Sequence, residues 1–287
     1  MLTRQKALLR LIANEGGSIG KTRLQKLAFS LRDEVVGSPT SKVYQFVPYH
    51  FGPYSFTMTH ELTKLASEGI ITISESEIAL SDSVPNIILE PALRTSVDYV
   101  SRRFANVKTE ALVTTVYSRN PWYTAKARDK AKRTSKVPSA SPAIFTVGYE
   151  GLMLEGLLDL LLRNGIKRLI DVRANPVARQ FGFHKSTLQR HCCDLDIEYV
   201  HVPELGIASV ERSSLDDQRS YDLLFSKYEA HTLKSQCRLV EQVGKMILET
   251  PSALMCMEAD CYCCHRTTLA REIHRQLGLS IKELRSE

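Results

Sequence analysis

Residues 144–172 read IFTVGYEGLMLEGLLDLLLRNGIKRLIDV, and this stretch decides the fold of the C-terminal half of the chain. An apolar strand at 144–147 precedes a helical pattern at 152–163, which stops at Asn164-Gly165 before a second apolar strand at 168–172. A strand, a helix and a further strand in succession are typical of a parallel sheet covered by helices. The expected class is therefore α/β, with a mostly parallel sheet flanked by helices.

The same alternation continues towards the C-terminus. We expect a helix at 186–195, a strand at 197–202, helices at 214–231 and 234–249, a strand that begins near 253 and a last helix at 267–277. Since the carboxyl ends of parallel strands share one edge of a sheet, the polar residues that follow these strands should meet there. These residues are Tyr149, Asp171, Arg173, Glu204, Cys256, Glu258, Cys264, His265 and Arg266.

The N-terminal part shows helical periodicity at 4–14, 20–31 and 56–68, followed by short strands at 70–73 and 77–80. This is the order of a winged helix-turn-helix, which we expect over residues 1–90. The sequence at Leu24-Gln25-Lys26-Leu27 and over residues 48–55 also resembles winged-helix modules fused to bacterial defence and regulatory proteins. The resemblance implies DNA contacts from Lys21, Arg23, Lys26, Tyr49, His50 and Tyr54. Alternatively, the aromatic residues cap a small core, or the module docks proteins.

Residues 91–140 are expected to form a helical connector and a basic linker before a catalytic α/β domain at 141–287. The run at 126–136 holds six cations against one acid, and a net charge of +6 also favours an anionic partner, which we expect to be double-stranded DNA. Its candidate phosphate contacts are Lys126, Arg128, Lys130, Lys132 and Arg133. A solvated helix end beside a linker would have the same composition.

The chain has no apolar run of about 18 residues and no signal-peptide core at its start, so we expect a cytosolic protein without a membrane partner. Its seven cysteines include the adjacent pairs Cys192-Cys193 and Cys263-Cys264, which are unlike a secreted disulfide framework. Thiols or metal ligands are therefore expected instead of disulfide bridges.

Several short motifs occur in order in the C-terminal half: Thr146-Val147-Gly148-Tyr149, Asp171-Val172-Arg173 with Pro176, Gly182-Phe183, Pro203-Glu204-Leu205-Gly206, and Cys256-Met257-Glu258 with Cys264-His265-Arg266. Together they resemble the domain-of-unknown-function family numbered 488 over residues 144–287. The resemblance implies a compact α/β domain that is often encoded near DNA-modifying or defence systems, and thus a phage-defence role. The chain departs from the family pattern by adding Cys261 and Cys263.

Three interpretations of the cysteine-rich segment stay open. Zinc could be bound by Cys256, Cys261, Cys264 and His265, but structural zinc sites usually take two ligand pairs from separate turns, so we expect no metal and no cofactor. Buried thiols could close the sheet edge, or Cys264 beside His265 and Arg266 could be a nucleophile.

The carboxylates suit a DNA-directed enzyme best, and we expect a DNA glycosylase that excises a modified or damaged base. Its catalytic candidates are Asp171, Glu258, Arg173 and His265. The candidates for substrate binding are Tyr149, Arg179, Phe183, Glu204, Cys256, Cys264 and Arg266. A structural network that joins Asp171 and Arg173 to Arg266 and Glu258 would use the same residues. The alternative functions are a DNA-binding regulator with a ligand- or redox-sensing C-terminal domain and a metal-dependent nuclease.

Overall fold

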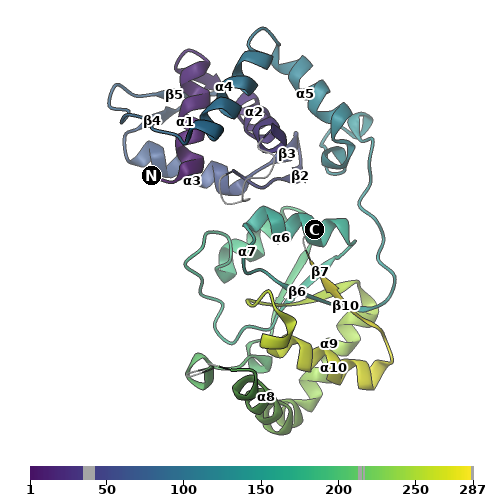
Figure 1. The fold of residues 1–287 in the computed structure, drawn as a ribbon. Helices are drawn as coiled ribbons and strands as arrows, with labels where there is room; N and C mark the ends of the chain where they lie inside the picture. The colour runs from purple at the N-terminus through teal and green to yellow at the C-terminus, as the bar shows by residue number, and fades with distance from the viewer. Residues whose placement is uncertain (35–42, 213–214, 216, 286–287) are drawn as a thin grey trace. The chain divides into compact units, whose positions relative to one another are not determined.

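The computed structural model of the chain describes residues 1–34, 43–212, 215 and 217–285. The chain divides into two compact units, Met1–Lys136 and Val137–Glu287, which are shown in Figure 1 and are described separately below. The composition of the basic linker predicts a boundary near residue 140, and the observed division lies after Lys136.

The first unit begins with α1 (Thr3–Asn14), β1 (Ser18–Gly20) and α2 (Lys21–Glu34). A short hairpin of β2 (Val47–Tyr49) and β3 (Gly52–Tyr54) leads into α3 (Phe56–Ser67), and the strands β4 (Ile71–Ile73) and β5 (Glu77–Leu80) follow. β5 lies between β1 and β4 in a small antiparallel sheet. The three helices and the strands β4 and β5 therefore occur in the predicted order, whereas β1, β2 and β3 are strands that were not predicted.

The residues expected as a connector belong to the core of the first unit. Helices α4 (Pro91–Phe104) and α5 (Thr109–Arg119) bury Val97, Val100 and Leu112 in the same apolar cluster as Leu8 of α1 and Leu24 of α2. Short 3-10 turns follow at η2 (Pro121–Thr124) and η3 (Lys130–Lys132). Since the apolar stripes of α4 and α5 are covered by α1 and α2, this segment contributes to folding of the first unit.

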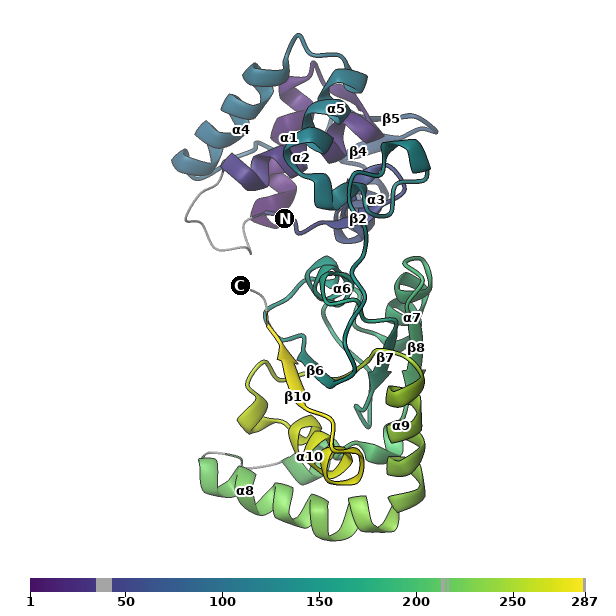
Figure 2. The ribbon, with the colours of Figure 1, turned by 90° about the vertical axis from the view of Figure 1, so that its right-hand side faces the viewer.

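The second unit contains a five-stranded sheet in the order β10-β6-β9-β7-β8, and every neighbouring pair is parallel. Its strands are β6 (Ile144–Gly148), β7 (Arg168–Asp171), β8 (Glu198–His201), β9 (Ser252–Cys256) and β10 (Ile281–Leu284). The predicted α/β class with a parallel sheet is confirmed. β10, which lies beside β6 at the edge of the sheet (Figure 2), has no counterpart among the predicted strands.

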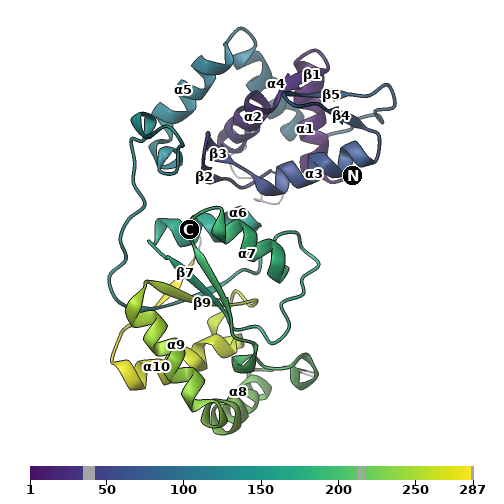
Figure 3. The same ribbon diagram turned by 180° about the vertical axis from the view of Figure 1, so that it is seen from behind.

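Helices cover both faces of this sheet. α6 (Leu154–Arg163) and α7 (Lys185–Cys193) lie on one side, while α9 (Cys237–Glu249) and α10 (His265–Leu277) lie on the other (Figures 1 and 3). α8 (Gln218–Lys227) continues through a π-helical stretch, η6 (Tyr228–Leu233), towards α9. The expected helix at 214–231 starts partly outside the described residues.

The side chains of each strand alternate between these two faces. Ile144, Ile170 and Leu254 pack in the apolar cluster that includes Val243 of α9 and Ile273 of α10. Neighbouring strand positions, such as Asp171 and Met255, consequently point to the side of α6 and α7. In the described part of the chain we find no helix whose length and apolar character would allow it to cross a lipid bilayer.

Candidate functional site

The chain leaves the neighbouring strands β6 and β9 in opposite directions, because α6 leads towards β7 and α10 leads to β10. In parallel sheets, ligands usually bind at the carboxyl ends of the strands. Gly148 of β6 pairs in register with Cys256 of β9 at this point. A Cβ atom on Gly148 would lie 1.9 Å from the Glu258 carbonyl oxygen, so the loop after β9 crosses directly over this glycine.

The predicted site residues do not form one group at this edge, since they separate into two clusters on opposite faces of the sheet. We call the group on the side of α6 and α7 the aspartate cluster, consisting of Asp171, Arg173, Tyr149, Phe183 and Tyr199. The group on the side of α9 and α10 is the cysteine cluster, consisting of Cys256, Glu258, Cys264, His265 and Arg212. Strand alternation explains the separation. Asp171 pairs in register with Met255, and Cys256, the next residue of β9, points to the opposite face of the sheet.

In the aspartate cluster, the carboxylate of Asp171 is completely buried and fully hydrogen-bonded. Arg173 donates to it from Nε at 2.9 Å, from Nη2 at 2.6 Å and from its backbone nitrogen at 3.1 Å. The Tyr199 hydroxyl donates to Oδ2 at 2.6 Å. Four donors saturate both carboxylate oxygens, so Asp171 has no lone pair directed at a substrate.

The rest of the aspartate cluster holds Arg173 in place. Arg173 Nη1 donates to the Tyr149 hydroxyl and to the Phe183 carbonyl, each at 3.0 Å. The rings of Tyr149 and Phe183 stack with centroids 4.1 Å apart and planes 12° from parallel. Burial, together with the negative charge of Asp171, raises the pKa of Tyr199. Tyr149 and Phe183 therefore stack on each other, and Arg173, which is 6% exposed, serves the internal network.

The cysteine cluster begins at the last residue of β9. The Cys256 thiol donates to Glu258 Oε2 at 3.1 Å, and its Sγ lies 3.7 Å from His265 Nδ1. Arg212 reaches the cluster from the 3-10 turn η5 (Ser209–Arg212), with Nη1 bound to Glu258 Oε1 and Nη2 lying 2.7 Å from His265 Nδ1. The side chain of Glu258 is 18% exposed, so this carboxylate is within reach of solvent.

The partners of His265 indicate which ring nitrogen carries its proton. His265 Nε2 lies 3.1 Å from the Val172 carbonyl oxygen, which can only accept a hydrogen bond. Nε2 therefore donates, and Nδ1 keeps a lone pair directed at Arg212 and Cys256. Glu258, His265 and Cys256 thus form a compact set with one carboxylate, one basic nitrogen and one thiol.

The two buried thiols of the cysteine cluster differ in acidity. A hydrogen bond from Cys264 is the largest influence on the Cys256 thiol and, with the hydrogen bonds to His265 and Glu258, it holds the pKa of Cys256 well below its usual value despite burial. Burial, and then the hydrogen bond to Cys256, raises the pKa of Cys264 well above its usual value. Deprotonation of the pair is therefore expected at Cys256 before Cys264. Cys261 and Cys263 are partly exposed on the next turn, η7 (Cys261–Cys263).

Arg266 fastens the loop between β9 and α10. This buried guanidinium donates to the carbonyls of Glu258 and Ala259 and forms an ion pair with Glu283 of β10 at 3.1 Å. The network anticipated between Asp171, Arg173, Arg266 and Glu258 is therefore wrong in its pairing, because Asp171 pairs with Arg173 and Glu258 pairs with Arg212. Arg179 and Glu204 are exposed. Sequence reasoning missed Arg212, since it follows no strand and belongs to no motif.

In the first unit, two of the predicted DNA contacts are directed inwards. Lys26 is 2% exposed and its Nζ donates to the Pro53 carbonyl at 3.1 Å. Arg23 pairs with Glu15 and donates to the carbonyls of Phe104 and Val107. The expectation that Lys26 contacts DNA is therefore not supported, because its ammonium group is enclosed by the fold. Lys21 is exposed at the start of α2, and Tyr54 is partly exposed on β3.

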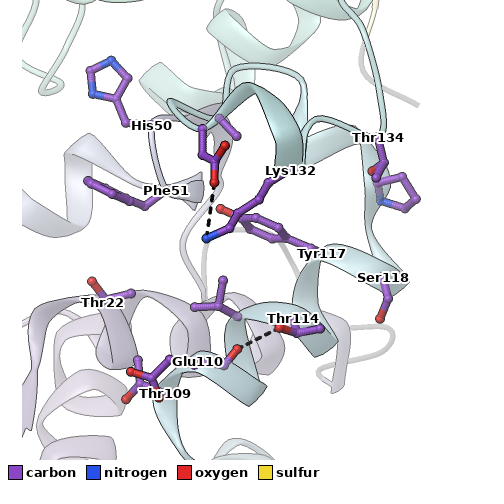
Figure 4. Close-up of a pocket in the computed structure, with 14 residues that line it drawn as sticks. Thr22, His50, Phe51, Thr109, Glu110, Thr114, Tyr117, Ser118, Lys132 and Thr134 are labelled. Carbon is purple, nitrogen blue, oxygen red and sulfur yellow. Dashed lines mark hydrogen bonds and ion pairs between the residues drawn. The ribbon is translucent and has the colours of Figure 1, made fainter.

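The hairpin at 47–54 and the basic run at 126–136, which are distant in sequence, meet in the fold. The Arg128 backbone nitrogen donates to the His50 carbonyl at 2.8 Å, and the rings of Tyr49 and His50 stack at 4.1 Å. The two segments and α5 border a pocket of about 730 Å³ (Figure 4). Phe51, whose side chain is 64% exposed, and Lys132 line it.

The other members of the basic run stand on the same segment. Arg128, Lys130 and Arg133 are exposed, whereas Lys126 is partly buried. Arg133 Nε donates to the Ala127 carbonyl at 2.7 Å, and Lys132 forms an ion pair with Asp129 at 3.7 Å (Figure 4). The basic run is therefore a folded part of the first unit, and several of its cations remain accessible to a phosphate.

Comparisons with known proteins bear on the second unit alone. No curated protein and no solved structure matches the chain. Both clusters of the second unit have most of their residues within 153–273, including Asp171, Arg173, Cys256, Glu258 and His265. That stretch, residues 153–273, matches the family described as Domain of unknown function DUF488, which supports the resemblance of the C-terminal half to this family.

Proposed function

We propose that the second unit hydrolyses the N-glycosidic bond of a modified or damaged base in DNA, with Glu258 as the reacting carboxylate. The observation that carries this proposal is the setting of Glu258, which follows β9 at the carboxyl edge of the sheet, is 18% exposed and is paired with Arg212. Arg212 orients the carboxylate through its hydrogen bond, while the remaining exposure of Glu258 leaves it accessible.

A glycosylase needs a carboxylate that stabilises an oxocarbenium-like sugar or orients the attacking water. Asp171 is poorly suited to this role, because Arg173 and Tyr199 occupy both of its oxygens in a fully buried position. Glu258 accepts from Arg212 at one oxygen and from the Cys256 thiol at the other. When the thiol turns away, Oε2 can accept a hydrogen bond from water.

We assign DNA binding to the first unit, as a winged helix-turn-helix. Support comes from the order of α1, α2 and α3 followed by the β4–β5 hairpin, with β1 completing a three-stranded sheet. The pocket between the hairpin at 47–54 and the basic run offers Phe51 as a stacking surface and Lys132 as a phosphate contact. A role against phage DNA is a prediction that rests on the family resemblance.

A DNA-binding regulator is the second candidate, and one observation favours it. The sulfur atoms of Cys256 and Cys264 lie within 4.8 Å of each other, and the pKa of Cys256 is well below its usual value, first because of the hydrogen bond from Cys264. A thiolate beside a second thiol is readily oxidised to a disulfide. A redox-sensing role would use these two thiols and require no turnover of DNA.

The decisive experiment incubates the full chain with duplexes that carry normal, damaged or hypermodified bases, without added metal or chelator, and then applies alkali. We expect strand breaks only after alkali, at abasic sites, and their loss in Glu258→Gln. Glu249→Gln is the matched control, because Glu249 is exposed and interacts with Arg168 at the opposite edge of the sheet.

Each other outcome contradicts the base-release activity or the role of Glu258 in it. Breaks that appear before alkali and that EDTA abolishes would indicate a metal-dependent nuclease. Binding of duplex DNA without any product would favour the regulator. Unchanged base release by Glu258→Gln would remove Glu258 from the reaction.

A further inference from the structure

We propose that Cys256, Cys264 and His265 bind a Zn²⁺ ion. One ligand atom from each residue lies within 4.8 Å of the other two, and all three residues are buried. Two thiolates and an imidazole are a ligand set that zinc prefers, and catalytic zinc sites use the same set with an open fourth position. This proposal goes beyond base removal, since metal binding can be measured without any substrate.

The distance between two of the ligand atoms already fits the metal. In tetrahedral geometry, a Zn–S bond of about 2.3 Å and a Zn–N bond of about 2.0–2.1 Å separate the sulfur from the nitrogen by about 3.6 Å. Cys256 Sγ and His265 Nδ1 are 3.7 Å apart. A zinc ion can therefore enter between them with little movement of either side chain.

The orientation of His265 is that of a metal ligand. Its Nε2–H donates to the Val172 carbonyl, which leaves the Nδ1 lone pair on the side of Cys256. Protein histidines that bind metals commonly donate their second ring nitrogen to a backbone carbonyl in this way. Arg212 Nη2 is directed at the same lone pair, and upon metal binding Arg212 would keep its ion pair with Glu258.

The charges of the cluster balance when zinc is present. Two thiolates and Glu258 carry three negative charges, while Zn²⁺ and Arg212 carry three positive charges. Since Cys256, Cys264 and His265 are at most 1% exposed, uncompensated charge here would be costly. Zinc thus allows both thiols to ionise in a buried site.

The three ligands are close together in sequence, but they come from two different structural elements. Cys256 ends β9, whereas Cys264 is the extended residue before α10 and His265 is the first residue of that helix. Two structural elements therefore supply the ligands, and the loop 257–263 brings them together. Cys261 and Cys263 stand on η7, outside the group of three ligand atoms.

Glu258 would stand beside the metal as a proton acceptor. Its Oε2 lies 3.1 Å from Cys256 Sγ and its Oε1 is bound by Arg212. Zinc held by Cys256, Cys264 and His265 would supply a Lewis acid that activates water, and Glu258 is placed to accept a proton. This role of Glu258 alone rests on the proposed reaction, and the metal site itself does not.

Metal analysis of the purified full chain tests the site. After equilibration with Zn²⁺ and removal of free metal, we expect about one Zn²⁺ per chain. Co²⁺ in its place should give thiolate-to-cobalt charge-transfer absorption and the intense ligand-field bands of a tetrahedral site. The variants Cys264→Ser and His265→Gln should lose the metal, while Cys261→Ser and Cys263→Ser, from the same loop, should retain it. Circular dichroism confirms that each variant is folded.

The Co²⁺ spectrum of the unaltered chain keeps the test independent of variant folding. A chain without stoichiometric zinc, or a cobalt spectrum without thiolate charge transfer, would overturn the proposal. Equal loss of zinc in Cys263→Ser and Cys264→Ser would also contradict it. If zinc binds as expected and no duplex loses a base, the metal site stands and the glycosylase proposal fails.

Discussion

The substitution Asp171→Asn separates a structural from a catalytic role for the residue that sequence reasoning placed first among the catalytic candidates. It removes the negative charge opposite Arg173, whose side chain is 6% exposed, and replaces an acceptor oxygen by a donor amide. Removing one member of a buried ion pair costs about 3–5 kcal/mol, because the other charge remains buried without compensation. We therefore expect Asp171→Asn to lower the free energy of unfolding of the second unit by about this amount.

The matched control is Asp159→Asn, the same chemical change in an ion pair whose partner, Arg163, is 47% exposed. Exposed pairs contribute roughly 0–1 kcal/mol, so this variant should unfold close to the unaltered chain. The two units can be observed separately in urea. The single tryptophan of the chain, Trp122, reports the first unit by fluorescence, whereas circular dichroism reports both. Asp171→Asn should shift the circular-dichroism transition and leave the fluorescence transition unchanged.

A companion variant tests the cause of the instability. Replacing both members of the pair, in Asp171→Leu with Arg173→Met, removes the uncompensated charge and should recover part of the lost stability. The reasoning would be refuted if Asp171→Asn unfolded within 1 kcal/mol of the unaltered chain while base release was abolished. Asp171 would then be a catalytic residue.

Three further predictions concern a buried lysine, a crowded glycine and an exposed cation. Burial lowers the pKa of Lys26 from 10.5 to about 7, so between these pH values the unfolded chain binds more protons than the folded chain, and the stability of the first unit rises with pH. Lys26→Met should abolish that rise and stabilise the first unit at pH 6 by roughly 2–4 kcal/mol. Unfolding followed by Trp122 fluorescence measures this difference, and an equal difference between variant and unaltered chain at pH 6 and pH 10 would contradict the prediction. Gly148→Ala would place its Cβ 1.9 Å from the Glu258 carbonyl oxygen, so it should lower the thermal stability and the base-release rate together, and an unchanged rate would show that the loop can move without consequence. Lys132→Gln should weaken duplex binding and reduce the slope of log affinity against log salt by about 1, whereas an unchanged slope would exclude Lys132 as a phosphate contact.

Much of the second unit could be predicted from local pattern. The strand at 144–148 and the helix at 154–163 follow from an apolar run, a helical stripe and the Asn164-Gly165 stop. The last strand, β10, was missed because only Leu284 of its four residues is buried, so its sequence lacks the apolar run of a central strand. At the site, the motifs gave the residue types, but motifs carry no information on which face of the sheet a side chain occupies.

In the first unit, periodicity identified α4 and α5 as helices but did not show what covers them. Their buried residues, such as Val97 and Leu112, face α1 and α2, and only the packing shows that they belong to the same core. The same limit applies to Lys26, whose charge suggested a surface contact, although the face of α2 that carries it is directed into the protein.

The sequence by itself determined the alternation of strands and helices, the parallel sheet of the second unit and the residue types at its carboxyl edge, because hydrophobic periodicity and turn residues act over a few positions. The tertiary structure alone decided how those residues pair. It placed Asp171 in a saturated buried network, brought Arg212 to Glu258 across 46 residues of chain, and set Cys256, Cys264 and His265 around one point. Such pairings depend on strand parity and on loops that return to the sheet, and these are properties of the folded chain as a whole.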